Sequence, residues 1–254
     1  MAYTNYYFMV HQGPDSAVRA SLNDVPFYRF DDPVAATRTG PAIHLLKPGT
    51  NVLSIEIDRA PASSQVFVEL AVDCDHQRAA VYREWPKLCE ELPPRERRLP
   101  LRYSTSFEPE GELFVPVYLD APPQAFDRGG TPELCEAVRA VHAAIAGKDV
   151  GEYTRLLELK VDEHRRAYAH WDDLHDALAT DELAGFFGEE LLVRPLELDR
   201  LCFDSRAGGR VAHVTHLDGG YVIEAVSITK GELDKRIRTD LTLTWHAGAW
   251  RVFR

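Results

Sequence analysis

The sequence predicts two domains, an all-β sandwich followed by an α+β domain whose helices pack on a curved antiparallel sheet. Residues 3–119 are short segments of alternating apolar and polar residues, separated by Pro, Gly, Asn and Asp. From Thr131 apolar residues recur at helical spacing for about 55 residues, and alternating segments then return. Between the two patterns lies APPQAFDRGG, whose two prolines and two glycines continue neither element. We therefore predict a sandwich over 1–120, a linker over 121–130 and an α+β domain over 131–254.

The composition excludes several classes of function. The 254 residues are 45% hydrophobic and 27% charged, which is typical of a globular chain. A formal charge of −11 repels nucleic acid and anionic lipid, so we expect neither as a partner. No apolar run reaches the roughly 20 residues of a membrane-spanning helix, and the first residues lack the pattern of a signal peptide. We therefore expect a cytoplasmic protein.

The cysteines give no sign of a metal site or of a disulfide framework. They are dispersed, without a CxxC pair or the Cys/His spacing of a zinc site, at Cys74, Cys89, Cys135 and Cys202. A reducing compartment disfavours a Cys74–Cys89 bridge. We therefore expect free thiols and no bound metal.

Strict alternation locates the strands of the first domain. Apolar residues alternate over 18–22 before the turn at Asn23-Asp24, and over 53–57 after the turn at Pro48-Gly49. A third set alternates over 66–72. We expect a last strand over Leu113–Leu119, where Pro116 suits an edge position.

Two of these segments carry a family resemblance. ASLNDVPFYRF, followed by IHLLKPGTNVLSIEID, resembles the core hairpins of galactose-binding-like jelly-roll modules, in which an LNG turn is followed by LKPGxNxLxIxI. Leu22-Asn23 matches the first motif, with Asp24 in place of the usual Gly, and Leu46–Ile57 matches the second. The resemblance implies a jelly-roll sandwich, usually without catalytic activity. Aromatic residues at alternating strand positions are more often core than a sugar platform, so we do not expect carbohydrate binding.

The second domain is predicted to begin with helices. Thr131-Pro132-Glu133 is a typical helix start, because Thr caps the first amides, Pro loses no bond there and Glu faces the positive end of the helix dipole. This helix is expected to end at Gly147. A second should run from Asp149 through Tyr168 with one continuous apolar face, and a third from about Trp171.

Strands follow to the end of the chain. Apolar alternation and Gly turns predict an antiparallel series over 191–203, 209–217, 221–228, 238–248 and 250–254. Helices followed by a long meander ending in LTLTWHAGAWRVFR resemble the NTF2-like (cystatin-like α+β) superfamily over residues 131–254. The resemblance implies a cone whose sheet and helices enclose a pocket, which serves isomerases, dehydratases, hydrolases and plain binding proteins alike.

The sequence contains no phosphate-binding loop, dinucleotide fingerprint, nucleophile-elbow serine or zincin helix, so we expect no cofactor. His164, His170 and His175 cluster near the second and third helices, but we interpret them as helix-edge residues rather than as ligands. His213 and His216 lie three apart on a strand, point to opposite faces and cannot chelate one ion together.

Acid–base chemistry is the strongest catalytic alternative. His164 lies on an apolar helix stripe, where burial would favour the neutral base, and Glu224 or Asp240 of the sheet could be its carboxylate partner. Four residues would line the same pocket, Tyr153, His164, Tyr168 and Trp171. A histidine bonded to a backbone carbonyl and aromatic residues packed in a core account for the same pattern.

Two hypotheses therefore remain open. The first is a non-enzymatic binding protein that recognises a protein partner, which the acidic charge suggests is basic, as an immunity or adaptor protein does. The second is a small-molecule isomerase, dehydratase or hydrolase that works in the pocket of the second domain. The sequence does not set the oligomeric state.

Overall fold

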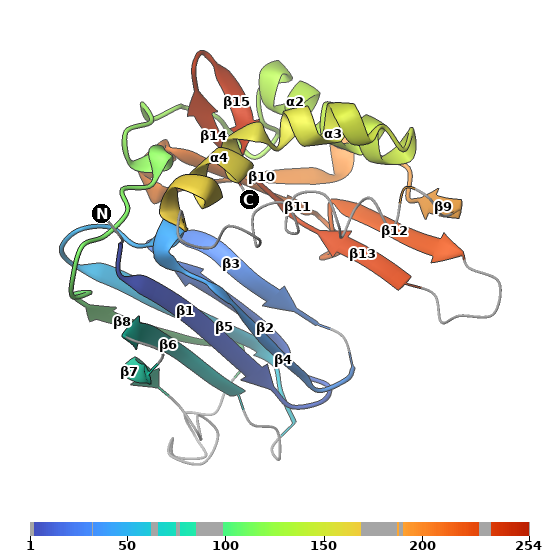
Figure 1. Cartoon of the computed structure of the whole chain (residues 1–254). Helices are drawn as coiled ribbons and strands as arrows, with labels where there is room; N and C mark the ends of the chain where they lie inside the picture. The colour runs from blue at the N-terminus through green and yellow to red at the C-terminus, as the bar shows by residue number, and fades with distance from the viewer. Residues whose placement is uncertain are drawn as a thin grey trace. The chain divides into compact units, whose positions relative to one another are not determined.

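A computed structural model describes residues 3–31, 33–61, 66–74, 77–84, 99–168, 187, 190–228 and 235–253. The chain divides into two compact units, Met1–Pro116 and Val117–Arg254, which are described in turn. Both units are rich in β-structure, with four antiparallel sheets in total among the described residues, as the sequence predicts (Figure 1). Within the same residues, no helix is long and apolar enough to cross a membrane.

The N-terminal unit contains two four-stranded antiparallel sheets, with strand orders β4-β1-β6-β7 and β3-β2-β5-β8. The strands are β1 Asn5–Gln12, β2 Ala17–Leu22, β3 Val25–Phe30, β4 Ala36–Pro41, β5 Asn51–Arg59, β6 Val66–Cys74, β7 Gln77–Glu84 and β8 Leu101–Phe107. The alternating sets predicted over 18–22, 53–57 and 66–72 fall within β2, β5 and β6. Strands β1 and β5 bury every second side chain, as in β5, where Leu53, Ile55 and Ile57 are buried.

Side-chain contacts join the two sheets of this unit. The rings of Phe8 on β1 and Phe27 on β3 lie 4.8 Å apart between centroids. The Tyr28 hydroxyl on β3 donates to Oε1 of the buried Gln12 on β1, at 3.0 Å. The sheets therefore pack face to face as a sandwich, inside which the polar groups of Tyr28 and Gln12 are paired with each other.

The strand predicted over Leu113–Leu119 is wrong. Phe114 and Tyr118 are buried at alternating positions, but residues 112–116 pair with no strand and Val117–Leu119 form a 3-10 helix, η3. Pro116 has no backbone N–H to donate to a ladder, and the boundary between the two compact units falls directly after it. The alternating apolar residues of this segment are therefore buried without being part of a sheet.

The segment 121–130, predicted as a linker, bonds to the C-terminal unit. The Gln124 amide donates to the Gly209 carbonyl at 2.8 Å, and the Phe203 amide donates to the Arg128 carbonyl at 3.0 Å. The Phe126 ring meets Trp250 edge-on at 5.5 Å. The segment therefore has no regular secondary structure, but these contacts hold it against the sheet of its own unit.

Three α-helices are described in the C-terminal unit, α2 Pro132–Ala146, α3 Val150–Leu156 and α4 Glu158–Ala167. The start of α2 is as predicted, with Oγ1 of Thr131 accepting from the Leu134 amide at 3.3 Å, and the helix ends at Gly147. The continuous helix predicted from Asp149 through Tyr168 is wrong, because it breaks at Leu157 (φ −90°, ψ 3°). Tyr153, Leu157 and Val161 nevertheless pack against one apolar core, so this part of the expected face is retained across the break. The helix expected from Trp171 lies outside the described residues.

Seven strands are described in the C-terminal unit, β9 Glu190–Val193, β10 Leu201–Arg206, β11 Val211–His216, β12 Ile223–Ile228, β13 Lys235–Thr239, β14 Leu241–His246 and β15 Ala249–Val252. They form sheets of order β10-β11-β14-β15 and β13-β12-β9. The single strands predicted over 191–203 and 238–248 are each split in two.

Register shows how the two sheets are related. The β11–β14 ladder reaches Val214 opposite Leu241, and the β12–β13 ladder resumes with Ile223 opposite Thr239. Residues 190–206, 211–228 and 235–246 are thus three long antiparallel stretches, interrupted at 194–200, 217–222 and 240. We call this line of interruptions the sheet break.

Helices α2 and α3 cover one face of this sheet (Figure 1). Leu134, Val138, Val141 and Ile145 of α2 are almost fully buried at three- and four-residue spacing. They pack in one apolar core with sheet residues that include Phe203, Val214, Ile223, Leu243 and Trp250. The space between helices and sheet is therefore filled by side chains.

Candidate functional site

A histidine–carboxylate pair lies at the sheet break. His216 ends β11 on the same face as the core residues Ala212 and Val214 and is 6% exposed. The chain turns after Leu217 and brings Asp218 back beside the ring, where Oδ1 accepts from Nδ1 of His216 at 2.5 Å. The same Oδ1 accepts from the Gly220 amide at 2.7 Å. The turn thus fixes the carboxylate against the imidazole.

Electrostatics keep this carboxylate ionised. The Gly220 amide is the main cause that lowers the pKa of Asp218 from 3.8 to about 2, and Arg194 and His216 add to it. An ionised Asp218 accepts a hydrogen bond from Nδ1 of His216, so Nδ1 carries the proton of the neutral ring and Nε2 has the free lone pair. Such a pair can position a general base in chemical terms.

Arginines extend the pair into a network across the sheet break. Asp218 lies 3.2 Å from Arg194 and 3.8 Å from Arg200, both of which belong to the stretch between β9 and β10. Arg194 also lies 3.8 Å from Glu224 of β12, and Nε of Arg238 on β13 donates to Glu224 at 3.1 Å. The network therefore ties together all three interrupted stretches where ladder hydrogen bonds stop.

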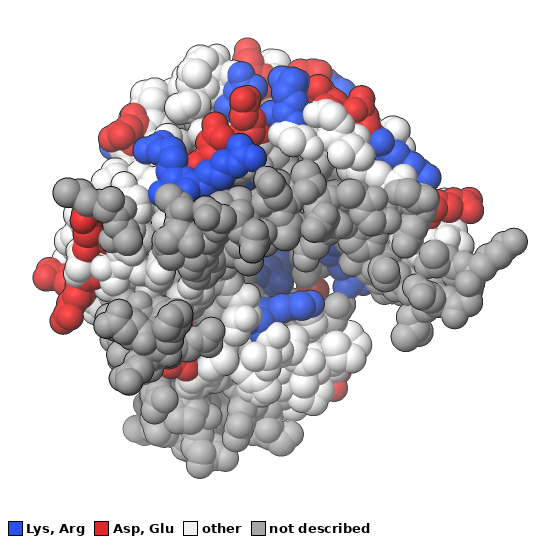
Figure 2. All heavy atoms as spheres, viewed as in Figure 1, with Lys and Arg blue, Asp and Glu red and all other residues white. Residues whose placement is uncertain are grey.

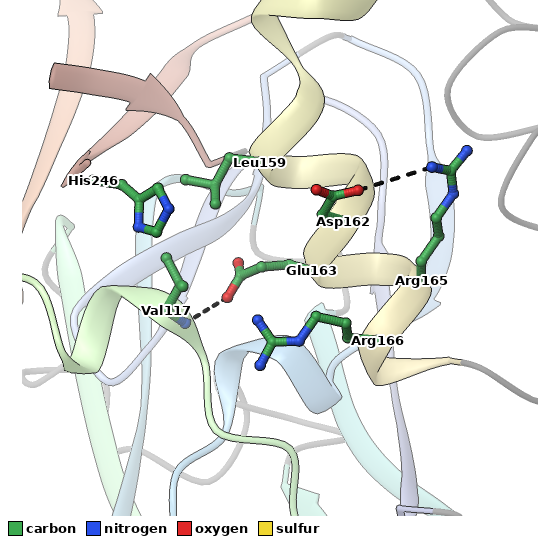
Figure 3. Close-up of a pocket in the computed structure, with 7 residues that line it drawn as sticks. All are labelled: Val117, Leu159, Asp162, Glu163, Arg165, Arg166 and His246. Atoms are coloured by element: carbon green, nitrogen blue, oxygen red, sulfur yellow. Dashed lines mark hydrogen bonds and ion pairs between the residues drawn. The ribbon is translucent and has the colours of Figure 1, made fainter. Parts of the chain in front are cut away.

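A second candidate is an open hollow of about 380 Å³ beside α4 (Figure 3). Leu159, Glu163 and Arg166 point into it from one face of the helix, and His246 faces them from the end of β14. Glu163 is 1% exposed, and its Oε1 accepts from the Val117 amide of η3 at 2.5 Å. Asp162 pairs with Arg165 at 3.8 Å on another side of α4.

The charged residues that line the hollow are of both signs, two carboxylates and two guanidinium groups. Among the described residues, positive and negative side chains lie next to each other over the upper part of the view in Figure 2. Ion pairs three residues apart within α2, α3 and α4 contribute to this pattern. The bond from Val117 uses one oxygen of Glu163 to hold η3 against α4, which is a structural role.

The proposed catalytic residues do not form one site. Nδ1 of His164 donates to the Lys160 carbonyl one turn earlier, at 2.7 Å, and the ring lies 5.9 Å from that of Tyr168. In the described chain the carboxylate of Glu224 is held by Arg238 and Arg194, not by His164. Asp240 lies at the sheet break between β13 and β14.

The proposed pocket-lining residues have separate surroundings. Tyr153 packs against the apolar core, 5.9 Å from the ring of Phe187. Tyr168 is fully buried and His164 half-buried. Trp171 lies outside the described residues, as do His170 and His175.

The cysteines and acidic residues of the described part form no group of three or more that could hold a metal ion. Cys135 is half-buried and Cys202 buried, both as free thiols. Burial, followed by the charge of Asp204, raises the pKa of the Cys202 thiol. The Cys74 and Cys89 side chains lie outside the described part.

Sequence reasoning missed the residues that do converge. His216 pairs with Asp218 and not with His213, and the H-x-D-G-G run over 216–220 is a local signal for the turn that folds Asp218 back. Glu163 and Arg166 lie on the same helix face as Leu159, but their spacing in the sequence does not show which residues of other elements this face contacts.

Comparisons of the chain with protein-family models, with curated proteins and with solved structures found no significant match.

Proposed function

We propose that the chain is a non-enzymatic binding protein that recognises a basic protein partner, in an immunity or adaptor role. The observation that carries the proposal is the filled interior of the C-terminal unit, where apolar side chains of α2 and the sheet occupy the space that an enclosed small-molecule site would need. Tyr153, which would line such a site, contributes to the core instead.

The finer fold assignment belongs to the same proposal. We assign Met1–Pro116 to the jelly-roll type and Val117–Arg254 to the NTF2-like type. Support for the first is two face-to-face sheets with Asn23 and Asn51 at the motif positions. Support for the second is a meander of three long stretches with helices on one face. Both types serve as binding scaffolds, so the assignment agrees with a non-enzymatic role.

The charge of the chain supports a basic partner. A net charge of −11 attracts a basic protein over a distance set by the ionic strength and accelerates encounter. Affinity for such a partner should fall as salt rises.

The test uses the full chain as bait in an extract of its native host, at about 50 and about 300 mM salt. We expect one basic protein at 1:1 stoichiometry, with a dissociation constant that rises with salt when the purified pair is measured by calorimetry. An unrelated acidic protein of the same net charge is the control bait. Recovery of no stoichiometric protein, or equal recovery on the control bait, would contradict the proposal.

The second candidate function is acid–base chemistry on a small molecule, and His216–Asp218 favours it. The ring is positioned by an ionised carboxylate, as a general base requires. A metabolite that raises the melting temperature of the wild type but not of His216→Gln would support this candidate. A metabolite screen without any such shift would leave the pair as part of the ionic network.

A further inference from the structure

Strand β9 ends its sheet with one edge open. In the order β13-β12-β9, its neighbour is β12, and among the described residues no strand pairs with its other side. The Arg194 amide donates to the Glu224 carbonyl at 2.8 Å, which makes 194 and 224 a hydrogen-bonded pair. Antiparallel pairs alternate, so the N–H and C=O groups of Leu191 and Val193 point away from β12.

The outer face of this edge has accessible apolar side chains between charged ones. Leu192 is 59% exposed and lies opposite Val226, and Ile228 is 41% exposed opposite Glu190. Leu191 and Val193 instead turn toward the core. An apolar edge strand whose outward backbone groups pair with none of the described strands is a template for a further strand.

The sequence of this strand is complementary to itself. When Glu190-Leu191-Leu192-Val193-Arg194 is laid antiparallel on a second copy about a twofold axis through Leu192, Glu190 lies opposite Arg194 at both ends. Leu192 lies opposite Leu192, and Leu191 opposite Val193. The outward backbone groups of Leu191 and Val193 then meet their counterparts and form four hydrogen bonds. The pairs at 190/194 and 192/192 are of the non-hydrogen-bonded kind, whose side chains approach most closely.

Neighbouring registers lack this match. An axis through Leu191 places Glu190 opposite Leu192 and loses both charge pairs. An axis through Val193 places Leu191 opposite Pro195, which has no N–H to donate. One register therefore satisfies the backbone, the charges and the apolar side chains together.

We propose that β9 pairs with β9 of a second copy of this chain and joins two sheets in the order β13-β12-β9-β9-β12-β13. The surface area that this contact buries is small compared with that of interfaces that hold dimers at nanomolar concentration. The charge of −11 on each copy also opposes association. The dimer therefore forms reversibly, at micromolar concentration, in moderate salt.

The first test is sedimentation of the full chain from about 1 to about 300 µM in about 150 mM salt. We expect a monomer–dimer equilibrium for the wild type. Glu190→Arg places like charges opposite each other and should weaken the dimer at least about tenfold. Glu112→Arg changes the net charge equally at an exposed site of the N-terminal unit and should not weaken it. A monomeric wild type throughout, or equal effects of the two variants, would overturn the proposal.

The second test is cross-linking with oxidised glutathione, which takes up the two electrons released when two thiols form a disulfide. Leu192→Cys places the thiols of two copies across the axis at a Cα separation suited to a disulfide. Leu217→Cys is the matched control, because Leu217 is 60% exposed in a loop. We expect Leu192→Cys dimers to form at least about tenfold faster than those of Leu217→Cys or of the wild type. Equal rates of dimer formation for Leu192→Cys and Leu217→Cys would contradict the pairing of two copies. The same result is expected if β9 instead pairs with an extended segment of another protein, so that outcome also contradicts the proposal.

Discussion

The side chains of Asn23 and Asn51 are hydrogen-bonded to each other at 2.7 Å and join the two turns that carry the jelly-roll motifs. Asn23 has a φ of +52° in the β2–β3 hairpin, and its amide also donates to the Leu45 carbonyl. Asn51 binds both ends of the turn at Pro48-Gly49 through the Lys47 amide, the Lys47 carbonyl and the Gly49 carbonyl. The two motifs thus meet through an amide pair in which Asn51 is buried and Asn23 half-buried.

Asn51→Ala should destabilise the N-terminal unit by about 3 kcal/mol, because Asn51 is fully buried and its loss leaves several polar groups without partners. Urea unfolding followed by fluorescence measures the difference. Ser54→Ala, on the same strand and at a half-exposed position, should cost less than about 0.5 kcal/mol. Similar losses for the two variants would show that the amide pair is not a main support of the unit.

Glu163→Ala should lower the stability of the C-terminal unit by about 3 kcal/mol, because it removes the buried acceptor of the Val117 amide. Glu163→Gln retains an oxygen acceptor at the same place and should cost clearly less. Thermal melts at neutral pH compare the variants. A larger loss for Gln than for Ala would contradict the hydrogen-bonding role.

Asp218→Asn should lower the melting temperature at neutral pH, and the deficit should shrink in acid. Folding lowers the pKa of this carboxyl from 3.8 to about 2, so its stabilising contribution is present above about pH 4 and disappears as the pH falls through about 2. Melts of both proteins from pH 2 to 7 measure the difference. Asp162→Asn, which removes a carboxylate 3.8 Å from Arg165, is the control and should have the smaller effect at neutral pH. A deficit that stays constant down to pH 2 would contradict the assignment.

His164→Leu should change stability by less than about 1 kcal/mol, because the lost bond to the Lys160 carbonyl is within one helix and the ring is only half-buried. Partner binding should be unchanged. Loss of ligand binding or turnover with normal melting would instead restore the catalytic interpretation of His164.

The position of the unit boundary can be tested with separate fragments. We expect 1–116 and 117–254 each to fold, because each compact unit has its own buried apolar residues. Residues 131–254 should be at least about 2 kcal/mol less stable than 117–254, since they lack the bonds of 121–130 to the sheet and the Tyr118–Phe253 ring contact at 5.3 Å. Equal stability in chemical denaturation would favour the linker over 121–130 that the sequence predicts.

Local chemistry accounts for what the sequence predicted well. The alternation in β2, β5 and β6 and the cap at Thr131 depend on neighbours within a few residues. At Leu113–Leu119 the same alternation misled, because it indicates which side chains are buried but not whether a backbone partner exists. The break at Leu157 had no Gly or Pro to mark it.

The candidate site was less accessible from sequence because its members come from distant strands. Arg194, Asp218 and Arg238 meet only after three stretches have aligned in register, which no periodicity encodes. For Glu163, a carboxylate on a charged helix predicts solvent exposure, and its burial depends on the Val117 amide of another element. Only the pairing of His216 with Asp218 is local enough to be read from the chain.

The sheet break has a mechanical consequence. Along this line the halves of the sheet are joined by three covalent crossings and by ion pairs, instead of by a continuous ladder. The half formed by the three strands β9, β12 and β13 can therefore open as a separate cooperative unit, at a lower free energy than the larger half formed by β10, β11, β14 and β15. Amide protons of β12 should therefore exchange with solvent faster than those of β11. Added salt should widen this difference in exchange rate, because it weakens the arginine–carboxylate pairs that hold the two halves together across the sheet break.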